Sequence, residues 1–373
     1  MDIRKNVEVC YTPGEYEYFK GEYDIVVVID VLRATSAICA AFENGIRSII
    51  PVATIEEAQD YKDRGYLVGA ERKGQIVDGF DFGNSPYSYM NEGFIGKDRA
   101  INPNKYFIIS INMFGNGLSS SPSNSIKAQH GSLFPEITLW DNIYCQHKLI
   151  TEKFKIKKIA LVAGWSMAGC QSYQWAAQYP DMVKSILPFC ASSKTSTHNH
   201  VFLEGVKAAL TADVNWHEGK YKKQPIAGLK AFGRVYAGWA FSQDFYRKKL
   251  YKKFGFTNVE GLLKNWANDH AKNWDANNLL SKLKTWQLND ISKNPIYKGD
   301  YIKALKSIRA KTILMPCNQD LYFRTEENEF EKRFIKKSLL RPVDSAYGHC
   351  AANPGNDKNF QRKLDQNITE LLI

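Results

Sequence analysis

Residues 159–183 read IALVAGWSMAGCQSYQWAAQYPDMV, and this stretch decides the fold. The apolar run at its start predicts a buried strand, and the second half has the pattern of an amphipathic helix. Between them stands Ser166, with small residues around it at Gly164, Ala168 and Gly169. A serine on a tight turn from strand to helix is typical of a nucleophile elbow, in which larger neighbours would collide. The alternative interpretation is a serine that only caps the helix.

Two short strands near the C-terminal end are each followed by a group that a nucleophilic serine needs. The apolar run 312–315 predicts one strand, and Asp320 follows it. The run 339–342 predicts the next strand, and His349 follows that one. A base must take the proton of the serine, and an acid must orient the base. The order Ser166, Asp320, His349 is that of the α/β-hydrolases and differs from the order in two other serine protease folds.

Composition limits the class of protein. With 373 residues, 44% of them hydrophobic and 24% charged, the chain can form a large globular domain or two domains. No apolar run approaches the length of a membrane span, and the start MDIRKNVEVC has no apolar signal core. The seven cysteines show no C-x-x-C pair and no metal-ligand spacing. We therefore expect reduced thiols, a cytoplasmic protein and no membrane partner.

The net charge of +11 includes lysine clusters at 153–158 and 248–253. One interpretation is a surface for nucleic acid or an anionic substrate. The other is a solvated lysine-rich face, and the sequence favours it because no nucleic-acid motif or aromatic-basic stripe accompanies the lysines. We therefore expect no nucleic-acid partner.

The first 97 residues have a different character from the rest. Apolar runs at 24–31, 48–52 and 67–70 predict strands. A capping box at 54–57 opens a predicted helix that ends at Gly65. Strands that alternate with helices predict a parallel α/β unit, here a truncated α/β segment over residues 1–97.

This segment resembles the N-terminal part of the magnesium-dependent 2-phosphosulfolactate phosphatases. The similar blocks are DVLRATS (30–36), IPVAT (50–54), GAER (69–72) and GFDFGNSP (79–86). The resemblance implies a phosphate and Mg²⁺ site formed by Asp30, Arg33, Ser36, Glu71 and Asp81. Arginine and hydroxyl groups at a helix start suit a phosphate, and carboxylates suit Mg²⁺. The alternative is helix capping and a surface ion pair. The resemblance stops near Lys97, so a site that needs the second half of that family would be incomplete.

Residues 98–373 resemble the homoserine O-acetyltransferase-like branch of the α/β-hydrolases. The similar blocks are PNKYFII (103–109), NMFGNGLS (112–119), DN (141–142), the elbow, YPD (179–181), the A-D-x-x-W-x-x-G-x-Y pattern (212–221) and GH (348–349). The resemblance implies an α/β fold with a mostly parallel sheet and a helical cap at about 192–308. It also implies Ser166 as nucleophile, Asp320 as acid and His349 as base. A small-molecule acyl substrate and a second copy of the chain are the expected partners. The acyl-transfer reaction needs no metal or organic cofactor.

Two departures leave the choice between acyltransferase and ester hydrolase open. The elbow reads GWSMAG, where transferases acting on homoserine usually have GGSMGG. The arginine expected to hold an amino-acid carboxylate has only an offset candidate, Arg234.

The beginning of the hydrolase part is replaced by the phosphatase-like segment. The run 106–111 predicts an early strand of the hydrolase sheet. The N–H of Met167 can give one oxyanion donor, but the loop that gives the second donor has no certain source. One hypothesis is that the loop after Asp30 supplies it.

The long insertion before the acid strand predicts a helical cap with helices over 206–211, 229–239 and 262–274. Its many aromatic side chains could line an acyl pocket over Ser166 or form ordinary helix core. The sequence therefore leaves three functions open: a serine acyl-transfer enzyme, a Mg²⁺-dependent phosphatase, and a fusion without activity.

Overall fold

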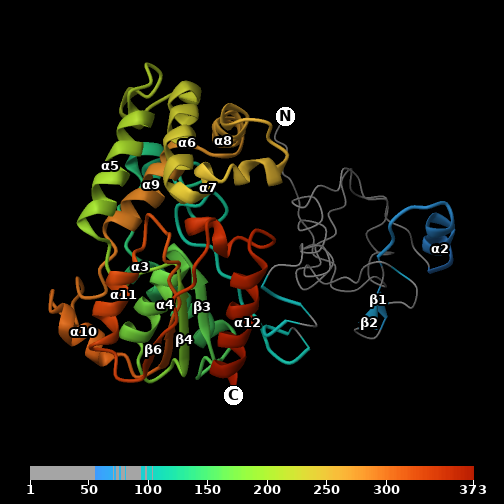
Figure 1. The fold of residues 1–373 in the computed structure, drawn as a ribbon. Coiled ribbons are helices and arrows are strands. Elements are labelled where there is room, and N and C mark those ends of the chain that lie inside the picture. Colours follow the sequence, from blue (N-terminus) through green and yellow to red (C-terminus); the bar gives the residue numbers. More distant parts are fainter. Residues whose placement is uncertain are drawn as a thin grey trace, which may run out of the picture. The chain divides into compact units, whose positions relative to one another are not determined.

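The computed structural model describes residues 55–69, 71–72, 75–76, 80, 94–96, 99–102 and 104–373 (Figure 1). The chain separates into two compact units, Met1–Asn91 and Glu92–Ile373.

In the first unit, the predicted helix after residue 54 is present as α2 (Ile55–Asp63). It is followed by β1 (Glu71–Arg72), which pairs antiparallel with β2 (Gln75–Ile76). Ala58, Val68 and Phe80 form a small buried cluster. The predicted strands at 24–31 and 48–52 lie outside the described residues.

The second unit contains a four-stranded sheet in the order β3-β4-β5-β6, and every pair is parallel. The strands are β3 (Val162–Trp165), β4 (Ser185–Phe189), β5 (Lys311–Leu314) and β6 (Ser338–Leu340). The prediction of a mostly parallel sheet is confirmed for the described strands. Because strands of a parallel sheet all point the same way, their carboxyl ends share one edge, where a ligand site is expected.

Helices cover both faces of this sheet (Figure 1). Successive side chains of β4 point to opposite faces, so Ile186 and Leu187 enter different hydrophobic clusters. The first cluster contains side chains from α3 (Leu139–Lys148), α4 (Met167–Gln178) and α10 (Tyr301–Ser307). The second contains side chains from α12 (Lys358–Leu372). The remaining elements outside the cap are η3 (Lys127–Gln129), η4 (Gly131–Leu133), η5 (Leu149–Lys153), α11 (Thr325–Lys332) and η8 (Gly348–Ala352).

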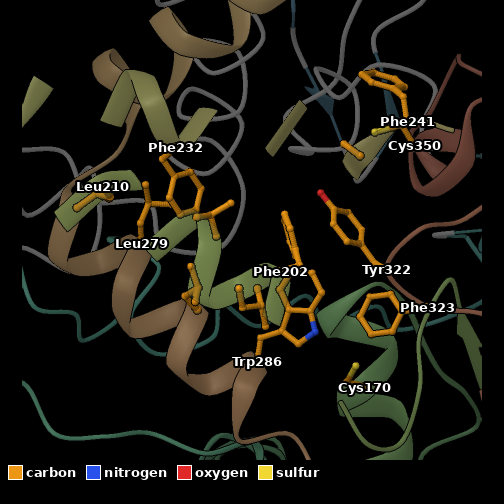
Figure 2. Close-up of a cluster of buried hydrophobic side chains, with 14 of the residues drawn as sticks. Cys170, Phe202, Leu210, Phe232, Phe241, Leu279, Trp286, Tyr322, Phe323 and Cys350 are labelled. Carbon is orange, nitrogen blue, oxygen red and sulfur yellow. The ribbon is translucent and has the colours of Figure 1, made fainter. Parts of the chain in front are cut away.

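A helical cap lies between β4 and β5 in the sequence and at one end of the sheet in space (Figure 1). Its elements are α5 (Thr197–Thr211), η6 (His217–Gly219), α6 (Ile226–Ala240), α7 (Gln243–Arg247), η7 (Leu250–Phe254), α8 (Val259–Asn273) and α9 (Ala276–Gln287). The predicted cap helices over 206–211 and 229–239 lie within α5 and α6, and the one over 262–274 lies in α8 except for its last residue. Their apolar faces meet in a third hydrophobic cluster, shown in Figure 2.

The prediction of a strand at 106–111 is wrong, because these residues form no strand. Ile109 and Ile111 pack against the core beside α3 and α4, as alternating strand residues would. A strand also needs a hydrogen-bonded neighbour. Within the described residues, β3 is the last strand on its side of the sheet, and 106–111 has no partner strand.

Candidate active site

Ser166 occupies a strained turn between β3 and α4. Its φ of 59° and ψ of −128° are rare for a residue with a side chain, and such strain is typical of functional sites. The Ser166 N–H donates to the carbonyl of Phe189 at 3.1 Å, and its carbonyl accepts from the N–H of Cys170 at 3.0 Å. The sheet and the helix therefore hold the strained residue from both sides.

The small residues around Ser166 are required because the start of α4 lies close to β3 and to the residues that follow β4. A Cβ atom on Gly164 would lie 2.3 Å from the carbonyl carbon of Ala168. A Cβ atom on Gly169 would lie 2.4 Å from that of Ala191. The steric reason given for the elbow pattern is confirmed, and Ala168 is accommodated where the strict pattern has glycine.

Asp320 and His349 are in contact. Asp320 is fully buried in the loop after β5, and one of its oxygens accepts the N–H groups of Tyr322 at 2.7 Å and Phe323 at 3.3 Å. The other oxygen lies 2.7 Å from Nδ1 of His349. Since a carboxylate only accepts, Nδ1 carries the proton and Nε2 is left to act as a base. Two predicted site residues, 29 positions apart, are thus brought together as acid and base.

The imidazole of His349 also lies against the residue before the serine. The ring of Trp165 is 5.2 Å from the imidazole between centroids. Tyr322 and Phe323 lie at 4.7 and 5.6 Å from the same imidazole. The hydroxyl of Ser166 makes no hydrogen bond within the described part of the chain, and catalytic hydrogen bonds are often long before substrate binds. No motif in the sequence marks these three rings, although Tyr322 and Phe323 stand two and three positions after Asp320.

Met167 is the first residue of α4, so its N–H has no acceptor inside the helix. This position suits the predicted oxyanion donor, which would also lie at the positive end of the helix. The proposed second donor, the loop after Asp30, lies outside the described residues.

Cys190, Asp320 and His349 offer ligand atoms within 4.8 Å of one another. Burial raises the pKa of the Cys190 thiol well above its usual range and that of Cys350 to about 12. Both thiols therefore stay protonated near the acid-base pair at neutral pH. The Asp320–His349 hydrogen bond already uses two of the three ligand atoms, so we assign the group to proton transfer.

Cap aromatics reach the loop that carries Asp320. Phe202 of α5 lies 5.1 Å from Tyr322, and Trp286 of α9 stacks on Phe323 at 5.4 Å (Figure 2). Phe202, Trp286 and Tyr322 are all buried, so they are core residues as well as neighbours of the site.

A buried carboxyl group that the sequence analysis missed links three elements near the site. Glu331 of α11 is fully buried and accepts from the N–H of Ser193 at 2.6 Å and its hydroxyl at 2.8 Å. The amide of Asn328 donates at 2.8 Å, and the hydroxyl of Tyr173 in α4 also donates. Burial raises the pKa of Glu331 to about 7. Glu331 stands among other charged residues of α11, so the sequence does not indicate that its side chain is buried.

The predicted phosphate and Mg²⁺ residues cannot be placed in the same way. Asp30, Arg33, Ser36 and Asp81 lie outside the described residues. Glu71 lies in β1, where only the backbone is described.

The family model of the α/β-hydrolase fold matches residues 82–352. The chain belongs to the α/β-hydrolase fold family. A second family model, 2-phosphosulpholactate phosphatase, matches residues 10–103. In the described part of the chain, no helix combines the length and apolar character that crossing a membrane requires.

Several esterases are similar to most of this chain. An ethyl acetate hydrolase from Pseudomonas veronii is 35% identical over 285 residues, which cover 76% of this chain and 81% of that protein. A probable esterase from Corynebacterium glutamicum is 31% identical over 281 residues, covering 74% and 80%. A homoserine O-acetyltransferase from Trichormus variabilis is 27% identical over 301 residues, covering 78% and 82%.

Solved structures agree with this placement. The acetyl esterase MekB has a TM-score of 0.73 at 35% identity and covers 75% of this chain and 81% of its own. An acetylester hydrolase from Corynebacterium glutamicum has a TM-score of 0.72 at 31% identity, with 75% and 80% covered. The chain is therefore an enzyme of the esterase and acyltransferase branch of its family.

Proposed function

We propose that the chain is a serine esterase that hydrolyses esters of short acyl groups such as acetate. The observation that carries the proposal is the 2.7 Å contact between Asp320 and His349 beside the strained turn at Ser166. The similarity to an ethyl acetate hydrolase and to acetyl esterases supports a short acyl group.

In the proposed reaction, the Ser166 oxygen attacks the ester carbonyl while Nε2 of His349 takes its proton. Asp320 holds the imidazole in the tautomer that this step needs and stabilises the resulting positive charge. The N–H of Met167 donates to the oxyanion. The imidazolium then protonates the leaving alcohol, and a water molecule activated by His349 releases the acid from Ser166. Apart from that water molecule, side chains and the backbone supply every group that these steps need, so the proposal includes no cofactor.

The state of Arg234 supports hydrolysis over transfer to an amino-acid acceptor. Its two terminal nitrogens donate to both carboxylate oxygens of Glu260 at 3.0 and 2.8 Å. Such a two-pronged pair satisfies the guanidinium, which then has little to offer an acceptor carboxylate.

The proposal is tested by hydrolysis of p-nitrophenyl acetate. We expect turnover by the intact chain and its loss in Ser166→Ala, while Ser132→Ala, at an exposed serine, keeps the activity. Adding homoserine should not divert the acetyl group to O-acetylhomoserine. Turnover unchanged in Ser166→Ala would reject the proposal.

A second candidate is a Mg²⁺-dependent phosphatase acting on a sulfonated phosphate ester, which the match over residues 10–103 favours. Of its expected ligands, Asp30 and Asp81 lie outside the described residues, and only the backbone of Glu71 is described. Phosphate release from 2-phosphosulfolactate that needs Mg²⁺ and is lost in Asp30→Asn would support it. Folded protein with neither activity would support the third alternative, an inactive fusion.

A further inference from the structure

A concave site of about 440 Å³ lies at the amino end of β3, and Ser166 lies at the other end of that strand. The wall is formed by residues before β3 and by residues that follow α4. They are His147, Thr151, Lys155, Ile156, Lys157, Lys158, Asp181 and Met182. Three lysines face one acidic residue in this set.

An unusual turn brings these lysines together. α3 continues into η5, which is a π-helix. Turns of this kind are rare in proteins, and those that occur are often found at functional sites. The N–H of Phe154 closes the turn on the carbonyl of Leu149 at 3.3 Å. Lys155 then has a φ of 56°, in the left-handed region that glycine normally occupies. Ile156 anchors the turn, because its N–H donates to the carbonyl of Ile150 at 3.1 Å.

The lysines of the site outnumber the carboxylates near it, which are Asp181 in the wall and Glu152, whose charge acts on His147. Lys155, Lys157 and Lys158 are exposed, and none pairs with a carboxylate of the described residues. The ammonium of Lys158 donates to the backbone carbonyl of Asp181. The carboxylate of Asp181 is engaged by Arg309 instead, which adds a further cation beside the site.

One further exposed lysine, Lys184, lies at this edge of the sheet. Its N–H donates to the carbonyl of Ile159, the residue after Lys158, at 2.9 Å. Lys311 follows on the next strand, but its ammonium donates to the carbonyl of Glu370 in α12, whose side chains pack on the other face of the sheet. A positively charged surface attracts anions up to about the Debye length, which is about 10 Å at moderate ionic strength.

The inner wall adds neutral hydrogen-bonding groups. The ring of His147 stacks on Tyr179 at 3.8 Å, and the hydroxyl of Thr151 donates to the carbonyl of His147 at 2.8 Å. Burial lowers the pKa of His147, which favours a neutral imidazole at pH 7. The lysines therefore supply the charge, and the histidine and threonine shape the floor.

We propose that this site binds a phosphate-bearing anion, either a free phosphate compound or the headgroup of an anionic lipid. A phosphate group offers several strong acceptor oxygens and more charge than a carboxylate, which matches three ammonium groups around one concavity. The site is at the opposite end of the sheet from Ser166, so binding does not depend on the esterase reaction.

The test measures pyrophosphate binding by calorimetry at low ionic strength, using the full chain. We expect binding that weakens with added salt. The triple variant Lys155→Gln/Lys157→Gln/Lys158→Gln should weaken it by roughly 10- to 100-fold. The matched control is Lys249→Gln/Lys252→Gln/Lys253→Gln, which removes the same charge from exposed lysines of the cap. The control should bind as the parent does, and so should Ser166→Ala.

Vesicle sedimentation separates the two sources of phosphate. Phosphatidylcholine vesicles that contain phosphatidylglycerol are compared with phosphatidylcholine alone. Pyrophosphate binding without vesicle binding assigns a free phosphate compound, and selective binding to the anionic vesicles assigns a lipid headgroup. Binding to neither probe would overturn the proposal. Equal loss in the two triple variants would also overturn it, because the attraction would then follow net charge and not this site.

Discussion

Gly164→Ala should disable the enzyme through the geometry of the elbow. The new Cβ atom would lie 2.3 Å from the carbonyl carbon of Ala168 and 2.4 Å from its oxygen. Carbon atoms in contact are about 3.5–4.0 Å apart, so the start of α4 must move by about 1 Å from β3. Overpacking of this kind costs about 1–3 kcal/mol of folding free energy. A displacement of about 1 Å at a reacting group costs about 10²-fold in rate, so kcat should fall by at least that factor.

The assay combines urea unfolding with hydrolysis of p-nitrophenyl acetate. Gly238→Ala is the matched control, because no atom lies within 4 Å of its added Cβ and the residue is in helix α6. That control should gain about 0.5–1 kcal/mol of stability and keep its kcat. If Gly164→Ala keeps the stability and kcat of the parent, the close approach of β3 and α4 is not as the structure has it.

Three further variants test the buried charges. Asp320→Asn should lower kcat by about 10⁴-fold at pH 7 with little change in fold, because the amide favours the wrong imidazole tautomer; circular dichroism and steady-state kinetics check this. Lys282→Met should raise the free energy of unfolding at pH 7 by up to about 3 kcal/mol, whereas Lys284→Met, at a half-exposed lysine paired with Glu136, should not. Burial lowers the pKa of Lys282 from 10.5 to about 8, so the unfolded chain binds more protons than the folded chain between these two pH values. The cost of burying the charged ammonium is therefore complete below pH 8, and the stability of the parent rises as pH increases from 8 to 10.5. The raised pKa of Glu331 makes the folded chain bind more protons than the unfolded chain between pH 4.5 and about 7, so the parent should lose stability as pH rises through this range. Glu331→Gln should remove that loss, and Glu329→Gln, at an exposed position, should keep it. Urea unfolding at pH 5 and pH 8 distinguishes the two variants.

The elbow could be predicted from the sequence because its constraint is local. Gly164, Ser166 and Ala168 lie within five positions, and their sizes alone report the tight turn. The order of the acid and the base along the chain could also be predicted from the sequence. Their 2.7 Å contact is seen only in the folded chain. The rings of Trp165 and Tyr322 around His349 could not be found by spacing, because Trp165 ends β3 and Tyr322 lies in the loop after β5, far away in the sequence.

The prediction of a strand at 106–111 is wrong for a reason that cannot be read from these residues alone. Ile109 and Ile111 are half-buried and pack against the hydrophobic cluster that contains α3 and α4. Whether such a segment becomes a strand depends on a neighbour that offers hydrogen bonds, and that neighbour is set by the rest of the fold. The sequence favours a solvated face for the lysine cluster at 153–158. The concavity that three of these lysines line in the structure cannot be seen in the sequence.

The most direct test of the central claim is peptide mapping after reaction with a fluorophosphonate, which labels activated serines. The account predicts that the adduct forms on Ser166 and that labelling slows by more than about 10³-fold in His349→Ala. An adduct on another serine, or labelling of Ser166 at the same rate without His349, would contradict the proposed triad.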